Sequence, residues 1–120
     1  MSDVVNLAQK FAQIPQPWQP RIVGQVNAMH VKLAKLSGEF IWHQHEAEDE
    51  LFFVVSGQLQ MHFRDRVETI NPGEFIIVPR GVEHKPVAEG ECQVMLFEPA
   101  STTNTGNAAD SDRTVQAEWL

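Results

Sequence analysis

Two histidines and a glutamate near the middle of the chain have the types and spacing of metal ligands. His43 and His45 are separated by one residue, and Glu50 follows after a short acidic stretch. Side chains two residues apart point to the same face of a β-strand, so the two imidazoles can converge on one point. Glu50 begins an apolar run and can face that point from a neighbouring strand. Imidazoles and a carboxylate favour a divalent transition metal, provided that a further ligand comes from elsewhere.

His84 is the candidate for that further ligand. It ends the pattern Gly-x5-Pro-x-Gly-x2-His, which begins at Gly73. Glycine and proline favour tight turns, and these turns would place the histidine at the start of a strand. Three neutral imidazoles and one carboxylate leave a divalent ion with a net positive charge and, in octahedral geometry, with open positions for water or substrate.

Strand signals dominate the part of the chain that must position these residues. Short runs of apolar residues, or of alternating apolar and polar residues, are separated by glycine, proline and polar turns. The runs cover residues 22–26, 29–36, 40–43, 50–55, 59–63, 67–70, 74–79, 84–88 and 93–97. Roughly eight to ten short strands of this kind predict an all-β fold, either a small sandwich or a barrel.

A short helix is expected before the strands and an irregular tail after them. Apolar residues at helical spacing predict a helix over residues 3–13, capped by Ser2 or Asp3. The barrel core should cover about residues 21–99. The polar stretch 100–120 should be irregular, and it either remains mobile or returns to the barrel. A chain of 120 residues is expected to form a single domain, residues 1–120.

The two groups of candidate ligands resemble the paired motifs of the cupin superfamily, in particular the small single-domain cupins of the cupin 2 type. The motifs read Gly38-x4-His43-x-His45-x4-Glu50-x6-Gly57 and Gly73-x5-Pro79-x-Gly81-x2-His84. The first motif is one residue shorter than usual between its glycine and its first histidine. The second usually ends in asparagine, where this chain has Ala88. The resemblance covers about residues 26–99.

This resemblance implies an antiparallel double-stranded β-helix, also called a jelly roll, with a metal inside the barrel. Carried over residue by residue, the ligands would be His43, His45, Glu50 and His84. The metal would be a divalent transition ion such as Fe, Mn, Ni or Zn. Similar small cupins usually form homodimers, so a homodimer is expected as well.

Several functions are compatible with such a site. With a redox metal, the chain would act as a dioxygenase-type enzyme on a small oxygen-rich metabolite. With Mn, Ni or Zn, it would act as a sugar isomerase or epimerase, the metal polarising a carbonyl. The alternative is a non-catalytic barrel that binds or senses a small molecule.

Composition excludes some partners. The net charge of −7 argues against nucleic acid and against an anionic membrane surface. No apolar run is long enough to span a membrane, and the first residues lack a secretory signal, so a cytoplasmic location is expected. Cys92 is the single cysteine, which leaves no intrachain disulfide or cysteine zinc cluster. Because no basic neighbour would favour its thiolate, a packed thiol on a strand is expected.

Phe40, Trp42, Phe52 and Val54 are candidates for the apolar lining around the metal, with simple core packing as the alternative, and strand alternation predicts their directions. Counting from Glu50 in steps of two, Phe52 and Val54 point inward. Counting back from His43, Ile41 points inward, while Trp42 and Phe40 point away.

Other polar residues near the motifs have two possible roles. Gln60 and His62 share a strand face, and would line the cavity if that face were the inner one. The surface interpretation is favoured for both, and for His30. Arg80, in the turn before His84, could hold an anionic substrate, although a surface position is favoured for it too.

Overall fold

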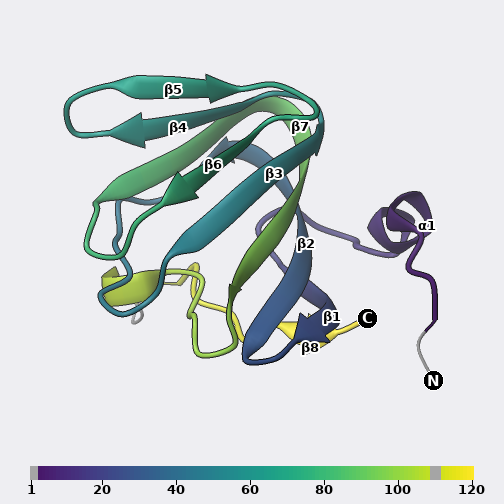
Figure 1. The fold of residues 1–120 in the computed structure, drawn as a ribbon. Helices are drawn as coiled ribbons and strands as arrows, with labels where there is room; N and C mark the ends of the chain where they lie inside the picture. The colour runs from purple at the N-terminus through teal and green to yellow at the C-terminus, as the bar shows by residue number, and fades with distance from the viewer. Residues whose placement is uncertain (1–2, 109–111) are drawn as a thin grey trace.

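The computed structural model describes residues 3–108 and 112–120 (Figure 1). It has a mostly β fold with a short N-terminal helix, as the sequence predicted. The elements within the described residues are α1 (Leu7–Ala12), β1 (Arg21–Val26), β2 (Met29–Glu39), β3 (Glu50–Ser56), β4 (Leu59–Phe63), β5 (Val67–Ile70), β6 (Phe75–Val78), β7 (His84–Pro99), the 3-10 helix η1 (Gly106–Ala108) and β8 (Glu118–Trp119).

Strand β7 connects the sheet. It pairs antiparallel with β2 over most of its length, with β3 through its second half and with β4 through its first half. The remaining antiparallel pairs are β1 with β2, β3 with β6, and β4 with β5. One strand that changes partners along its length forces the sheet to curl, and Figure 1 shows the sheet folded over an interior.

Period-two alternation fills that interior. On β7 the inward residues are Cys92, Val94 and Leu96, all buried. Residues of the same kind on β3 and β4 face them, and the cluster includes Phe52, Val54, Leu59, Met61 and Phe63. The prediction that Phe52 and Val54 point inward is therefore confirmed. Because Leu59, Met61 and Phe63 face the core, the alternating Gln60 and His62 lie on the outer face of β4, as favoured.

The helix is shorter than predicted and has a different cap. It covers Leu7–Ala12 rather than residues 3–13, and the side chain of Asn6 accepts a hydrogen bond from the Gln9 amide. Asp3 is therefore not the cap, and Ser2 lies outside the described residues. Phe11 packs with Leu33 in a second apolar cluster on the outside of β2. Within the described residues, no helix has the length and apolar character needed to cross a membrane.

The described parts of the tail return to the barrel. Strand β8 pairs in parallel with β1, and the amide of Leu120 donates to the carbonyl of Ile22. The C-terminus consequently lies beside β1 and β8 (Figure 1). Of the two alternatives expected for the tail, the return to the barrel is therefore the one found for residues 118–120. Apart from η1 and β8, the described part of the tail is irregular, as predicted.

Candidate metal centre

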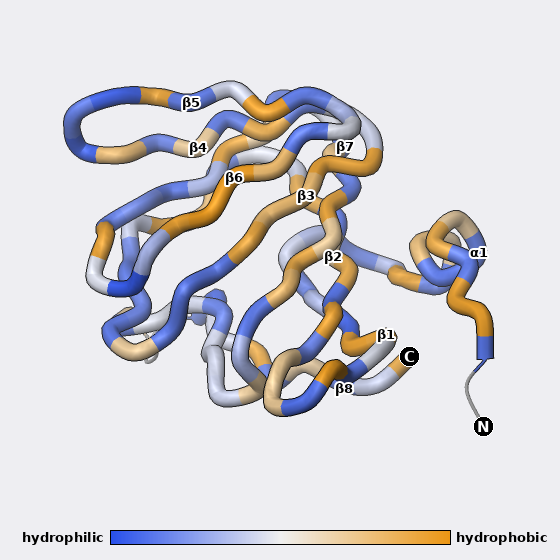
Figure 2. Tube along the Cα trace, in the orientation of Figure 1, coloured by the Kyte–Doolittle hydropathy of each residue, from blue (hydrophilic) through white to orange (hydrophobic). Residues whose placement is uncertain are grey.

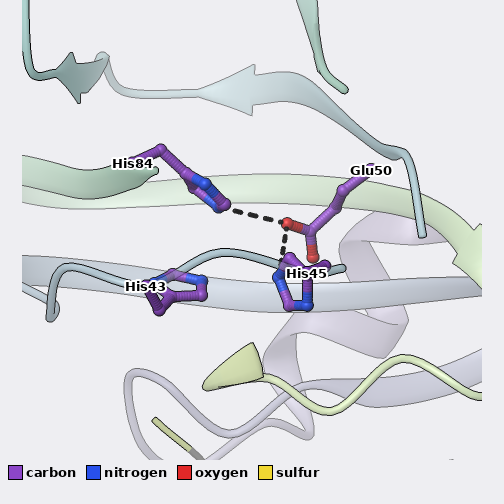
Figure 3. A group of neighbouring side chains, drawn as sticks. All are labelled: His43, His45, Glu50 and His84. Carbon is purple, nitrogen blue, oxygen red and sulfur yellow. Dashed lines mark ion pairs between the residues drawn. The ribbon is translucent and has the colours of Figure 1, made fainter. Parts of the chain in front are cut away.

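The structure brings the four predicted ligands together inside the barrel (Figure 3). His43, His45, Glu50 and His84 are all buried, and each offers a nitrogen or oxygen atom within 4.8 Å of the others. Glu50 starts β3 and His84 starts β7, so two of the side chains have strand positions.

The segment that holds the other two histidines is not a strand, contrary to the prediction for residues 40–43. It forms a single antiparallel bridge, in which His43 and His84 exchange backbone hydrogen bonds of 3.0 and 2.9 Å. The carbonyl of His45 accepts a hydrogen bond from the amide of Gly81, at 2.8 Å. The turn at Gly81 therefore fixes both sides of the site, since it also leads into His84.

The tail fixes this segment from the other side. The amide of Asn107 donates to the carbonyl of Gln44 at 2.9 Å, and the Asn107 side chain accepts from the amide of Gln44 at 2.8 Å. Gly106 lies so close that a Cβ there would overlap the Gln44 carbonyl and approach Nδ1 of His45 to 3.2 Å. Sequence reasoning missed this support, because no motif links residue 44 to residue 106.

Backbone contacts set the tautomers of two histidines. Nδ1 of His43 lies 2.9 Å from the carbonyl of Ile41, and Nδ1 of His84 lies 2.9 Å from the carbonyl of Val82. A carbonyl can only accept, so each Nδ1 carries the proton and donates. Each Nε2 is left with its lone pair directed away from the backbone. This arrangement is typical of metal-binding histidines.

Buried polar atoms in the cluster have no partner among the described residues. They are both ring nitrogens of His45, Nε2 of His84 and Oε1 of Glu50, none of which makes a hydrogen bond in the described part of the chain. The Glu50 oxygen is 3.3 Å from Nε2 of His45 and 3.6 Å from Nε2 of His84 (Figure 3). Unsatisfied buried groups typically cost about 1 to 3 kcal/mol each, and a cation between this oxygen and the two Nε2 atoms would satisfy three of the four. The donor set therefore fits a divalent metal ion.

Ionisation favours metal binding too. Burial, together with the neighbouring His84, lowers the pKa of His43 to about 4. Burial alone would raise the pKa of Glu50, but the adjacent His45 and His84 outweigh it and hold this pKa below its ordinary value. At neutral pH His43 is thus neutral and Glu50 is a carboxylate, which are the forms that bind metals.

The neighbouring charged residues lie outside the cluster. Glu46 and Asp49 are exposed, which leaves Glu50 as the buried carboxylate of the acidic stretch. Arg80 is mostly exposed, and its guanidinium lies 3.6 Å from the Asp49 carboxylate. The surface position favoured for Arg80 is therefore confirmed.

Comparison with known proteins identifies the family. The sequence profile of the Cupin domain family matches residues 29–98, which is more than half of the chain. The chain belongs to the cupin family. This cupin is also 30% identical over 86 residues to the uncharacterized protein YdbB of Bacillus subtilis (strain 168), covering 71% of this chain and 76% of that protein.

Solved structures agree with the assignment. A cupin-2 domain containing protein from Shewanella frigidimarina is 46% identical, with a TM-score of 0.79 over 80% of this cupin and 94% of that chain. Protein NMB1881 from Neisseria meningitidis is 36% identical, with a TM-score of 0.75 over 81% of this cupin and 99% of that chain. The expected cupin fold is therefore confirmed.

A cavity of ≈ 50 Å³ adjoins the cluster and has both His43 and Glu50 in its wall. Phe40 lines it as well, with its ring 5.4 Å from that of His43, so the prediction that Phe40 points away was wrong. The alternation argument fails there because the chain is not paired as a strand between β2 and the bridge at His43. Trp18, from the connector after α1, stacks on Phe40 at 4.8 Å between ring centroids.

Two charged residues in the cavity wall were not predicted. Lys32 and Glu98 are 4% and 3% exposed, and their charged atoms are 3.7 Å apart. Burial and the nearby Glu50 carboxylate raise the pKa of Glu98 well above its ordinary value, while Lys32 opposes this shift. One signal was available for Glu98, because it continues the inward series of Val94 and Leu96.

Proposed function

We propose that this cupin binds one divalent transition metal through His43, His45, Glu50 and His84 and acts with it on a small oxygen-rich metabolite. The observation that supports this proposal most directly is the set of buried, unpartnered ligand atoms. The reaction is of the dioxygenase type if the metal is redox-active, or of the isomerase or epimerase type with Mn, Ni or Zn. A bound ion of either kind would supply Lewis acidity to a substrate held beside these residues.

The residues of the chain prepare the site before any ion or substrate arrives. The backbone carbonyls of Ile41 and Val82 hold two imidazole rings in the tautomer that leaves Nε2 available. The apolar rings of Phe40 and Phe52 line the adjoining cavity and keep water from one side of the ligands. A small metabolite bound in that cavity would therefore have much of its surface shielded from solvent.

Elemental analysis of the purified protein tests the ligand set. We expect about one divalent ion per chain in the wild type and at least a tenfold loss in His45→Ala, because that variant removes a ligand. His62→Ala is the matched control, since His62 lies on the outer face of β4. It should retain the metal. Equal metal content in His45→Ala and the wild type would refute the assignment.

Turnover assays on metal-loaded protein separate enzyme from binding module. Oxygen consumption with catechols or enediols, and interconversion of aldoses and ketoses, cover the two reaction types. Metal-dependent turnover supports an enzyme. Retained binding of such molecules without turnover would instead support the non-catalytic barrel.

We further propose that two copies of this cupin pair through the outer face of β3 and β6. On β6, Phe75 and Ile77 are 60% and 52% exposed. Their cross-strand neighbours on β3 are Phe53 and Leu51, so four apolar side chains share one face. Figure 2 shows both strands as largely hydrophobic segments. An exposed apolar face of this kind is typical of an interface between subunits.

A further inference from the structure

The cavity beside the candidate metal centre contains a buried cation. Lys32 lies on β2 and shares the cavity wall with His43 and Glu50. Its ammonium is 3.7 Å from Oε1 of Glu98, a longer separation than a hydrogen bond. Oε2 of Glu98 is buried and makes no hydrogen bond among the described residues, although Glu50 and Thr102 lie beside this carboxyl. A buried ion pair needs further hydrogen bonds to offset its desolvation, so this pair is suited to receive a polar ligand.

The charges around the cavity favour an anion once a metal is bound. A divalent ion would contribute two positive charges and Lys32 one, against one negative charge on Glu50 and at most one on Glu98. At least one positive charge therefore remains in a largely apolar cavity. A ligand with a negative charge would offset this excess, whereas a neutral ligand would leave it in place.

The remaining wall is apolar and tightly shaped. Leu36 and Phe52 belong to it, together with the stacked rings of Trp18 and Phe40. Trp18 has a φ of 63°, which bulky residues seldom adopt. Two hydrogen bonds of 2.8 Å hold it there, from its amide to the carbonyl of Lys35 and from its indole to the carbonyl of Ser37. Backbone strain at a cavity wall is a frequent feature of ligand sites.

We propose that Lys32 is the anion-recognising residue of this cavity and that its ligand is a small organic acid with one carboxylate. Lys32 holds the carboxylate, and the short apolar part of the acid packs against Phe40 and Phe52. A cavity of ≈ 50 Å³ has room for roughly three to five water-sized groups, which corresponds to an acid of a few carbon atoms. This inference rests on the proposed function, and it specifies the substrate class of that same site.

Calorimetric titration with propanoate tests the proposal, with propanamide as the neutral molecule of equal size. Metal content is measured on every sample. We expect metal-loaded wild-type protein to bind propanoate and to show at least tenfold weaker binding of propanamide. Lys32→Met removes the charge at similar volume and should weaken propanoate binding roughly tenfold to a hundredfold, with metal content unchanged.

Lys35→Met is the matched control. Lys35 lies on the same strand, and its ammonium is paired with Glu91 at 4.0 Å. This variant should bind propanoate like the wild type. Lys32→Met leaves Glu98 as an unpaired buried group, which can prevent folding. In that case Lys32→Met/Glu98→Gln, which removes both ionisable groups, takes its place with the same expected loss of propanoate binding.

The results separate this inference from the proposed function. Three results would overturn the role of Lys32 and leave the metal site in place. They are metal-loaded wild type that binds no propanoate, equal binding of propanamide and propanoate, and full propanoate affinity in the variant without Lys32. Wild-type protein that takes up no metal would overturn the proposed function itself, and with it the positive charge on which anion binding depends.

Discussion

Gly106→Ala should loosen the segment that holds His45, although residue 106 is no candidate ligand. The new methyl group would overlap the carbonyl of Gln44 and crowd Nδ1 of His45. Helix η1 must therefore move away. This movement breaks the two hydrogen bonds between Gln44 and Asn107, at 2.9 and 2.8 Å.

The size of the effect follows from two contributions. Each lost hydrogen bond costs about 1 kcal/mol of unfolding free energy. Alanine at the φ of 52° found for Gly106 costs about 1 to 2 kcal/mol more. The sum is a destabilisation of about 3 to 4 kcal/mol. His45 also loses its fixed position, so metal affinity should fall at least tenfold.

Gly73→Ala is the matched control, which measures the backbone contribution without a steric one. Gly73 has a φ of 84°, and a Cβ at this position would meet nothing within 4 Å. Only the backbone cost applies, about 1 to 2 kcal/mol, and metal affinity should stay unchanged. Urea unfolding of the metal-free variants and chelator competition of the loaded ones measure both quantities. Equal destabilisation by the two substitutions, with equal metal affinity, would refute the role given to η1.

Two further predictions concern pH and assembly. The pKa of His43 is about 4, below its ordinary 6.5, so falling pH protonates the unfolded chain first. The contribution of His43 to the free energy of unfolding is therefore fully present above pH 6.5, and it decreases by up to about 3 kcal/mol as the pH falls towards 4. Urea unfolding of metal-free wild type and His43→Gln at several pH values should show that the wild type loses more unfolding free energy between pH 6.5 and pH 4. Parallel curves of unfolding free energy against pH would contradict this prediction. Ile77→Lys should convert the proposed dimer to monomers in light scattering, and Lys85→Ala, on another strand, should leave it intact. An unchanged mass for Ile77→Lys would place the interface elsewhere.

The ligand set was predictable because its information is local. His43, His45 and Glu50 lie within one short stretch, and the turn residues before His84 fix its place at a strand start. The structure brings these four residues together although residues 40–43 are not a strand. A single bridge between His43 and His84 suffices, because two backbone hydrogen bonds orient both residues.

The remainder of the cavity could not be predicted, for a different reason. Strand β2 is buried on both faces, with Leu33 in the cluster beneath α1 and Leu36 inside the barrel. Lys32 belongs to the polar set of the alternating run 29–36, so this pattern does not show that Lys32 faces inward. Trp18 and Asn107 act through contacts with distant parts of the chain, and sequence patterns do not record such contacts.

The pairing of β2 with β7 has a consequence for how the chain reaches this structure. Its register joins Met29 to Pro99 and Glu39 to Val87, so the largest part of the sheet closes over a long intervening loop. The entropy cost of closing a long loop must be met before the contacts that compensate it have formed, and folding is therefore slow. During synthesis, β2 has β1 as its hairpin neighbour but must wait for β7 until residue 99 has emerged. The last of the four candidate ligands, His84, arrives with that same strand. Metal present during refolding should therefore accelerate a late step, after β7 has joined the sheet, and leave the initial collapse unchanged.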